Sequence, residues 1–371
     1  MRFLHISDLH LGKRIFEFSM LEDQKYILNE IAEIAKSLSA DAVLIAGDVY
    51  DKSVPTAEAV AVFDNFLNML TDLGIKVFII SGNHDSMERL QFGAKLMQPS
   101  GVYINAVFSG VPSPIVLHDE YGEINLYLLP FIKPAHVKAA IEGCEPQTTD
   151  EAVKEIIGMM NINTDKRNIL VAHQFAAGSS VCDSEELLAG GSTGVGADVF
   201  AQFDYTALGH LHSPQKVISD NIRYSGSPLK YSFSETSHVK SVVMVDIRSK
   251  GDINITLHPL SPMRDMRKIQ GSYNDVTLLE NYKHQNTSDY VHITLTDEED
   301  IPNAISKLRS IYPNIMSLSY DNKRTRENKS MEIYNDDEIS PTELIEAFYY
   351  QQNNQRLSDY QAEIVKSLLP D

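Results

Sequence analysis

Short apolar runs alternate with amphipathic segments through the first eighty residues of the chain. Residues 2–7, 42–46 and 76–80 are mainly apolar runs with the length and composition of buried strands. Between them, residues 21–38 and the stretch that opens at Pro55 place apolar side chains at helical spacing. A repeated strand, helix, strand order predicts a parallel sheet with helices on both faces. Such sheets gather ligands outside the carboxyl ends of their strands.

The middle of the chain continues this alternation less regularly. It predicts strands near 102–107, 124–129, 168–172 and 205–208, and helices near 86–97, 134–141 and 150–161. Alternating apolar and polar positions predict a second group of strands, which closes a sandwich, at 222–225, 239–247 and 252–258. Residues 176–196 are rich in Gly and Ser and form either a mobile active-site loop or a surface connection.

The pattern changes near residues 261–271, which we interpret as a domain boundary. Residues 1–265 then form a first domain, and residues 266–335 form a small α+β domain. Residues 340–371 open on a capping-box sequence and contain two amphipathic helical segments with little else to cover their apolar faces. We interpret them as a helical partner-binding segment, although core-facing helices would show the same pattern.

Composition narrows the class of protein. The chain has 371 residues, of which 43% are hydrophobic and 22% charged, and no apolar run reaches the length that a bilayer requires. The N-terminal stretch lacks the apolar core and cleavage site of a signal peptide, so we expect a soluble, cytoplasmic protein. Cys144 and Cys182 are the only cysteines and lack metal-type spacing, so we expect free thiols.

The formal net charge of -19 argues against a protein that coats nucleic acid by bulk electrostatic attraction. It does not exclude a local contact with nucleic acid. Lys323, Arg324, Arg326 and Lys329 make a short basic loop that is either a solvated turn or a nucleic-acid contact. The acidic balance also suits an enzyme that concentrates metal ions, although a solvated surface explains most of these charges.

Metal-ligating side chains follow five of the predicted strands. The set is Asp8, His10, Asp48, Asn83, His173, His210 and His212. Taken singly, a histidine at a strand end is more often structural, and it is the whole set that predicts a site. The mixture of carboxylate, amide and imidazole suits borderline-hard divalent ions such as Mn²⁺. The lack of cysteine in the set argues against structural zinc.

Two metal ions fit this set, with Asp48 as the bridging ligand because it ends a central strand. One ion would take Asp8, His10 and His212, and the other Asn83, His173 and His210. Such a pair, about 3.5 to 4 Å apart, clamps a phosphate ester and lowers the pKa of a bound water. Neither a Ser-His-Asp order nor a Gly-rich phosphate loop with Lys is present, so acyl transfer and direct nucleotide-triphosphate hydrolysis have no support.

His84 and Asp51 are the candidate catalytic residues beside the ligands. His84 follows the ligand Asn83 and is expected to face the substrate, and Asp51 lies three residues after Asp48. A carboxylate that orients an imidazole favours its charged form, which is a good proton donor to a leaving alkoxide. We therefore predict His84 as the proton donor and Asp51 as its orienter. A turn carboxylate is the alternative reading of Asp51.

The motifs resemble those of the calcineurin-like metallophosphoesterases in their complete pattern and order: Asp8-x-His10, Gly47-Asp48-x-x-Asp51, Gly82-Asn83-His84-Asp85, His173 and Gly209-His210-x-His212. Three further segments look like the nuclease subunits of that family which work with an SMC-like ATPase, namely 1–12, 207–215 and 224–228. This resemblance covers nearly all of the chain.

The resemblance implies a four-layer α-β-β-α sandwich with a small α+β capping domain and C-terminal helices. It implies a manganese-dependent DNA nuclease of recombination, repair and replication, which is an exonuclease on double-strand ends and an endonuclease on single strands and hairpins. It also implies a homodimer joined by helices near 56–72 and 86–98, and a heterotetramer in which the last helices dock on the ATPase. Archaeal and eukaryotic relatives carry a second histidine where this chain has Asp51, so that histidine's role does not transfer.

Two other functions are open to the same sequence. A phosphatase or cyclic-nucleotide phosphodiesterase would use the same two metals, but a small substrate needs neither the α+β domain nor the terminal helices. A noncatalytic scaffold would have no chemical reason to keep seven polar groups converging on one cleft.

Overall fold

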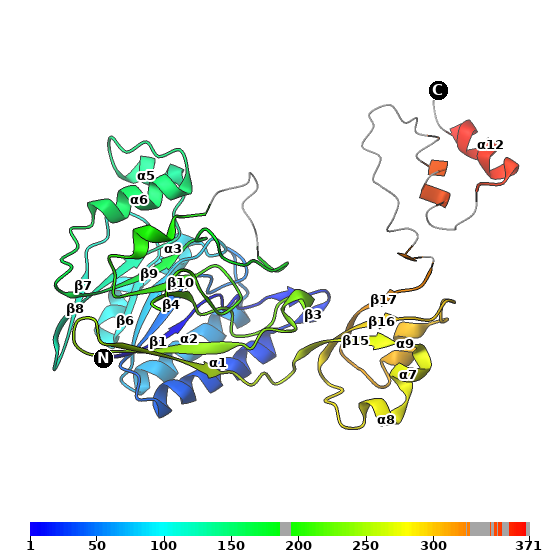
Figure 1. Cartoon of the computed structure of the whole chain (residues 1–371), viewed down its shortest axis with the longest axis horizontal. Coiled ribbons are helices and arrows are strands. Elements are labelled where there is room, and N and C mark those ends of the chain that lie inside the picture. The colour runs from blue at the N-terminus through cyan, green and yellow to red at the C-terminus, as the bar shows by residue number, and fades with distance from the viewer. Residues whose placement is uncertain are drawn as a thin grey trace. The chain divides into compact units, whose positions relative to one another are not determined.

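The fold is described from a computed structural model of the chain (Figure 1). The description covers residues 1–185, 194–323, 325–326, 342, 345–346, 348–350 and 356–368. The chain divides into two compact units, Met1–Met266 and Arg267–Asp371, and each is described by itself. The predicted boundaries after residue 265 and between 335 and 340 stay predictions.

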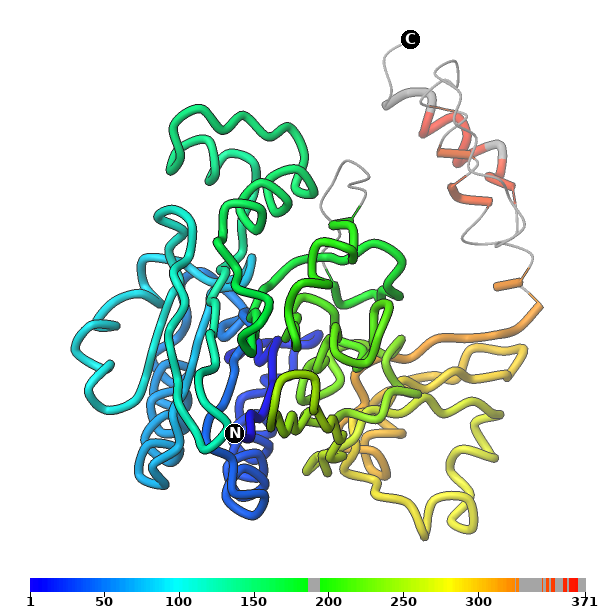
Figure 2. Tube along the Cα trace, turned by 60° about the vertical axis from the view of Figure 1, so that its left-hand side comes forward, coloured from blue at the N-terminus to red at the C-terminus, as the bar shows by residue number. Residues whose placement is uncertain are grey.

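The first sheet of the large unit has six strands in the order β14-β13-β1-β4-β5-β6. Their bounds are β1 Arg2–Ile6, β4 Ala42–Ala46, β5 Lys76–Ile80, β6 Val102–Asn105, β13 Ser241–Ile247 and β14 Ile253–Pro259. Strands β1, β4, β5 and β6 run parallel, and β13 and β14 are antiparallel to their neighbours. The N-terminal strand, blue in Figure 2, is therefore an inner strand.

The second sheet has the order β11-β12-β10-β9-β8-β7. Its strands are β7 Ile115–Asp119, β8 Gly122–Leu129, β9 Arg167–His173, β10 Tyr205–Gly209, β11 Gln215–Lys216 and β12 Ile222–Tyr224. Strands β8, β9, β10 and β12 are parallel. The predicted strands 239–247 and 252–258 do form, as β13 and β14, but their assignment to the second group was wrong. Strand β13 pairs with the edge of β1, where Val243 and Val245 enter the core, and β14 pairs with β13.

The two sheets pack face to face over an apolar core. Alternate residues of β4, Ala42, Leu44 and Ala46, enter this core together with Ile169 and Val171 of β9. The expectation of helices on both faces of the first sheet was therefore wrong, since one face is covered by the second sheet. Helices α1 (Leu21–Ser37) and α2 (Ala57–Asp72) cover the other face (Figure 1).

Helices also cover the outer face of the second sheet. Val153, Ile156 and Ile157 of α6 (Thr149–Met159) pack in a cluster with Leu170 and Leu208 of the sheet. The short α5 (Pro134–Ala140) joins α6 there. The order helix, sheet, sheet, helix confirms the four-layer α-β-β-α sandwich. Both cysteines are free, as predicted.

The predicted helix near 86–97 is broken into two pieces, α3 (Met87–Gln91) and α4 (Ala94–Met97). Gly93 separates them with φ +75°, a left-handed conformation that stops a helix. The short remaining connections are β2 Arg14–Ile15, β3 Phe18–Ser19, η1 Gln98–Ser100, η2 Ala197–Phe200 and η3 Phe233–Glu235.

The second unit contains a three-stranded sheet in the order β15-β16-β17 with its own core. Its elements are β15 Met266–Gly271, α7 Tyr273–Thr277, α8 Leu279–Tyr282, β16 Tyr290–Leu295, α9 Ala304–Leu308, β17 Ile315–Tyr320 and α12 Asp359–Leu368. Over its described part, the stretch 266–335 contains both helices and strands, and its assignment as a separate α+β domain stays a prediction. Half of the predicted helix 341–352, part of the basic loop at 323–329 and part of the loop 176–196 lie outside the described residues.

In the part of the chain that the structure describes, no helix is both long enough and apolar enough to cross a bilayer.

Candidate active site

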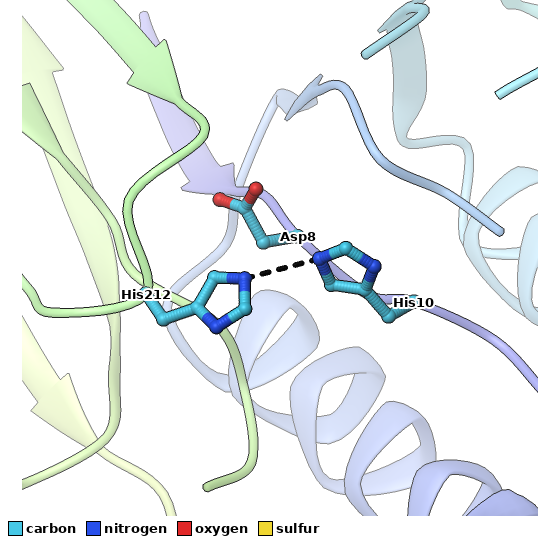
Figure 3. A group of neighbouring side chains, drawn as sticks. All are labelled: Asp8, His10 and His212. Atoms are coloured by element: carbon cyan, nitrogen blue, oxygen red, sulfur yellow. Dashed lines mark hydrogen bonds between the residues drawn. The ribbon is translucent and has the colours of Figure 1, made fainter. Parts of the chain in front are cut away.

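The predicted ligands meet where the carboxyl ends of both sheets face one side of the unit. Asp8, Asp48 and Asn83 follow β1, β4 and β5 of the first sheet, whereas His173 ends β9 and His210 follows β10 of the second. Figure 3 shows Asp8 and His10 leaving the first strand while His212 approaches from the other sheet. Strand order alone therefore brings distant parts of the chain to one point.

The backbone at the site is strained. Asp8, His10, Asp48 and His210 have positive φ values of 54°, 45°, 51° and 108°. Left-handed backbone is costly for residues other than glycine and collects at functional sites, where the surrounding structure holds it in place. These turns re-aim each side chain as it leaves its strand, which a straight extended segment could not do.

The glycines of the motifs allow the two sheets to approach closely. A Cβ atom on Gly209 would lie 1.9 Å from the carbonyl oxygen of Ala46, and one on Gly82 would lie 2.1 Å from Oδ1 of Asp48. No side chain fits at either position. Glycine is therefore required before His210 and Asn83 so that ligands from different strands can converge.

The first predicted ligand group is assembled. Nε2 of His10 lies 3.1 Å from Nε2 of His212, and Asp8, His10 and His212 each present a ligand atom within 4.8 Å of the others. The Asp8 carboxylate is fixed from behind, since it accepts hydrogen bonds from the Ser7 hydroxyl at 2.5 Å and from the His210 amide at 3.0 Å. All three ligands are almost fully buried.

The second predicted group is assembled around Asn83. Its Oδ1 lies 3.1 Å from Nε2 of His173 and 3.0 Å from Nδ1 of His210. Asp48 lies between the groups, with Oδ2 at 3.4 Å from Nε2 of His173 and 3.7 Å from Nε2 of His10. This central position is what a bridging ligand requires.

Burial and charge set the protonation of the site. Burial lowers the pKa of His210 to about 3, helped by the charge of His173, and burial also lowers the pKa of His10 well below its ordinary value. Burial opposes ionisation of Asp48, but His173, His10 and His84 together hold the pKa of that carboxyl below its usual range. The neutral imidazoles of His10 and His210 and the ionised Asp48 carboxylate are the forms that bind a metal. Burial opposes the charge of His173, but Asp48 raises the pKa of that imidazole to about 9, so a metal ion bound there would displace its proton.

The donor set fits two divalent ions. Two imidazole nitrogens that face each other at 3.1 Å, as in His10 and His212, need a cation or a shared proton between them. Nδ1 of His10 is buried without a hydrogen-bond partner. Carboxylate, amide and imidazole donors together suit Mn²⁺, Fe²⁺ or Zn²⁺ in a non-structural site.

His84 lies at the edge of this cluster, and the structure changes the predicted role of Asp51. Nδ1 of His84 lies 3.1 Å from the backbone carbonyl of Asp51, whereas the Asp51 carboxylate accepts a bond from Lys13 at 2.8 Å. Orientation by the carboxylate was wrong, because the turn after Asp48 points that side chain toward Lys13. His84 also forms a possible ligand group with His10 and Asp48.

Sequence reasoning missed a buried support for His212. The hydroxyl of Ser184 lies 2.7 Å from Nδ1 of His212 and donates to Glu235 at 2.6 Å, and Glu235 pairs with Lys240 at 2.5 Å. Burial opposes the charge of Glu235, but His212 and Lys240 hold its pKa well below the usual range. These residues follow no strand, so no periodic signal indicated them.

Comparison with known proteins agrees with the fold. A family model described as calcineurin-like phosphoesterase matches residues 1–214, and a second, described as the type 5 capsule protein repressor C-terminal domain, matches residues 262–353. The chain belongs to the calcineurin-like phosphoesterases. It is also 36% identical to the D subunit of the nuclease SbcCD of Staphylococcus epidermidis over 374 residues, which cover 100% of this chain and 98% of that protein.

Solved structures show more distant similarity. A dimetal phosphatase from Danio rerio is 10% identical and covers 70% of this chain and 96% of its own, with a TM-score of 0.43. A protein of Thermus thermophilus is 12% identical and covers 69% of this chain and 98% of its own, with a TM-score of 0.41.

Proposed function

We propose that this chain is the nuclease subunit of an SbcC-type ATPase complex and hydrolyses DNA phosphodiester bonds with two metal ions. The observation that carries the proposal is the convergence of seven candidate metal-binding side chains from both sheets, six of them buried and Asn83 half-buried. It is supported by the full-length similarity to a nuclease subunit, which includes the second unit as well as the phosphoesterase domain.

The proposed metal ligands are those predicted from the sequence. Asp48 would bridge, with Asp8, His10 and His212 on one ion and Asn83, His173 and His210 on the other. The metals would supply an activated water and an electrostatic clamp on the scissile phosphate. We propose Mn²⁺ as the ion because the mixed donor set suits it. The chain's own part is to hold the donors in a dry, strained frame that needs no rearrangement during reaction.

His84 is the proposed proton donor to the leaving oxygen. Its Nδ1–H donates to the Asp51 carbonyl, which leaves Nε2 free to hold the transferable proton. Asp51 thus orients His84 through its main chain. Its carboxylate holds Lys13, whose ammonium also lies 5.6 Å from the ring centre of Tyr231. The partly buried Lys13 ammonium beside the site would attract the anionic phosphate backbone of DNA.

The proposed assembly is a homodimer within a heterotetramer with SbcC, acting on double-stranded ends and hairpins in the cytoplasm. Phe92 and Leu96, near the predicted dimer helices, are 84% and 85% exposed. Apolar side chains so exposed suit a subunit contact. A chain with net charge -19 also gains from a partner that supplies basic surface for DNA.

The purified protein with Mn²⁺ should degrade linear duplex DNA and cut a hairpin. Removal of metal with EDTA should reduce the rate to background, because the buried site has no other electrophile, and added Mn²⁺ should restore it. The assay is gel analysis of end-labelled DNA. Activity on small phosphoesters with none on DNA would favour the phosphatase alternative, and metal-free cutting would overturn the two-metal proposal.

Removing residues 340–371 should abolish association with the ATPase and leave manganese-dependent cutting by the isolated subunit unchanged. The reason is that every proposed site residue lies in the first unit, Met1–Met266. Co-purification with the ATPase measures the first effect and the DNA assay the second. Unchanged association would refute docking by these helices.

A further inference from the structure

A buried ion pair lies directly behind His212. Glu235 is fully buried in η3 and pairs with Lys240, which is 5% exposed. The Lys240 ammonium donates three bonds: to Glu235 at 2.5 Å, to the Ser227 hydroxyl at 2.8 Å and to the carbonyl oxygen of His212 at 2.7 Å. Each ammonium hydrogen therefore has an acceptor, and one of them fixes the main chain of the ligand.

Ser184 joins this pair to the His212 ring. Its hydroxyl lies 2.6 Å from Oε1 of Glu235 and 2.7 Å from Nδ1 of His212. The carboxylate paired with Lys240 can only accept, so the single hydroxyl proton of Ser184 goes to Glu235. Toward His212 the hydroxyl then acts as an acceptor, and Nδ1 of His212 must carry the ring proton.

This proton arrangement decides which nitrogen of His212 is free. A neutral imidazole with its proton on Nδ1 has its lone pair on Nε2. Nε2 is the atom that faces His10 at 3.1 Å inside the cluster. The hydrogen bonds run from His212 through Ser184 to Glu235. His212 therefore presents a lone pair on Nε2, rather than an N–H, to the proposed first metal.

Residues 183–185, the segment that contains Ser184, also contact the main chain of His212. The His212 amide donates to Oε1 of Glu185 at 2.5 Å, and the Asp183 amide donates to the Ser234 hydroxyl at 3.2 Å. Residues 183–185 are thus tied both to the ligand and to η3. Burying a charged pair costs free energy of desolvation, and the Glu235–Lys240 pair serves to orient His212 as well as to stabilise the fold.

We propose that Ser184 is a positioning residue that fixes the His212 tautomer through Glu235 and Lys240, so that Nε2 of His212 is free to bind the first metal. The proposal rests on the proposed two-metal centre. It makes the site depend on the segment 183–185, which no motif in the sequence marks.

Three variants separate this role from simple packing. Ser184→Ala removes the link, and we expect about tenfold weaker binding of one Mn²⁺ with the other unchanged, because outer partners of metal-bound histidines contribute about 10- to 100-fold in affinity. Ser184→Thr keeps the hydroxyl and should restore the affinity. Glu235→Gln should be worse than Ser184→Ala. The amide oxygen of the introduced glutamine must accept from Lys240, so its NH₂ group donates to Ser184. The Ser184 hydroxyl would then donate to Nδ1 of His212, which reverses the direction of both hydrogen bonds.

The controls are Ser180→Ala, on the same loop but exposed, and Asp119→Asn. Asp119 forms a comparable buried pair with Arg167 at 2.6 Å, at the opposite end of β1. Neither control should change Mn²⁺ affinity, even though the second should lower the melting temperature.

The decisive measurements are Mn²⁺ titration by calorimetry and long-range ¹H–¹⁵N NMR of the metal-free protein, with the His212 signal assigned from a His212→Asn variant. We expect two Mn²⁺ per wild-type chain, an Nδ1–H tautomer in the wild type and an Nε2–H tautomer in Glu235→Gln. Two tight sites in Ser184→Ala, or an Nε2–H tautomer in the wild type, would overturn the positioning role. Fewer than two Mn²⁺ in the wild type would instead overturn the proposed centre.

Discussion

Replacing Asp48 with asparagine is expected to empty the metal centre and to lower DNA cleavage by at least about a thousandfold. The carboxylate is the one group placed between both ligand clusters, 3.4 Å from His173 and 3.7 Å from His10. Metal stabilisation of the transition state is worth several kcal/mol, and about 4 kcal/mol corresponds to that loss. Metal content by mass spectrometry and cleavage of labelled duplex measure the two effects.

The matched control is Asp64→Asn, an exposed aspartate of α2 that bonds only to the Asn68 side chain among the contacts described. It should keep both metal and activity. Asparagine at position 48 has nearly the shape of aspartate and can still accept the His84 amide bond now 2.9 Å long, so circular dichroism should stay native. Two bound metals and full activity in Asp48→Asn would refute the bridging role.

Replacing His84 with alanine is expected to lower cleavage of DNA by about 10² to 10⁴ while both metals stay bound, because general acid catalysis contributes that range. The loss should depend on the leaving group. A p-nitrophenyl phosphodiester releases a stable anion that needs no proton, so its hydrolysis should fall far less than that of DNA. Parallel kinetics on the two substrates, with metal analysis, provide the measurement.

His118→Ala is the control for this variant, since His118 is an exposed histidine on β7, with 67% of its side chain accessible. Its loss should leave both rates unchanged. Loss of metal from His84→Ala would show that His84 is a ligand, as its proximity to His10 and Asp48 allows. An equal loss on both substrates would show that it does not protonate the leaving oxygen.

Sequence reasoning predicted most of the candidate ligands that the fold brings together, because strand ends are local features. Each ligand follows an apolar run that is recognisable on its own, and parallel strands end at one edge. The sequence could not assign β13 and β14 to a sheet, because pairing with β1 depends on which edge of the completed sheet is open. It also could not show that Asp51 turns away from His84, since that depends on a turn whose side-chain direction has no periodic signal.

The residues that orient His212 could not be predicted from the sequence for a different reason. Ser184, Glu235 and Lys240 come from a loop, a short 3₁₀ turn and the residue before a strand, so nothing in their own neighbourhood distinguishes them from surface positions. Only the folded chain shows that Glu235 is fully buried and fully paired. Buried charges without a motif are found from the structure alone.

The inner position of β1 has a consequence for synthesis of the protein. Strand β1 precedes the other strands of the described chain and pairs with β13, where Arg2 faces Asp246 and His5 faces Val243. The first sheet therefore stays incomplete until some 240 residues have emerged, and pairings of such long sequence separation form slowly. Asp8 and His10 are therefore made some two hundred residues before His212, the residue that completes their ligand group.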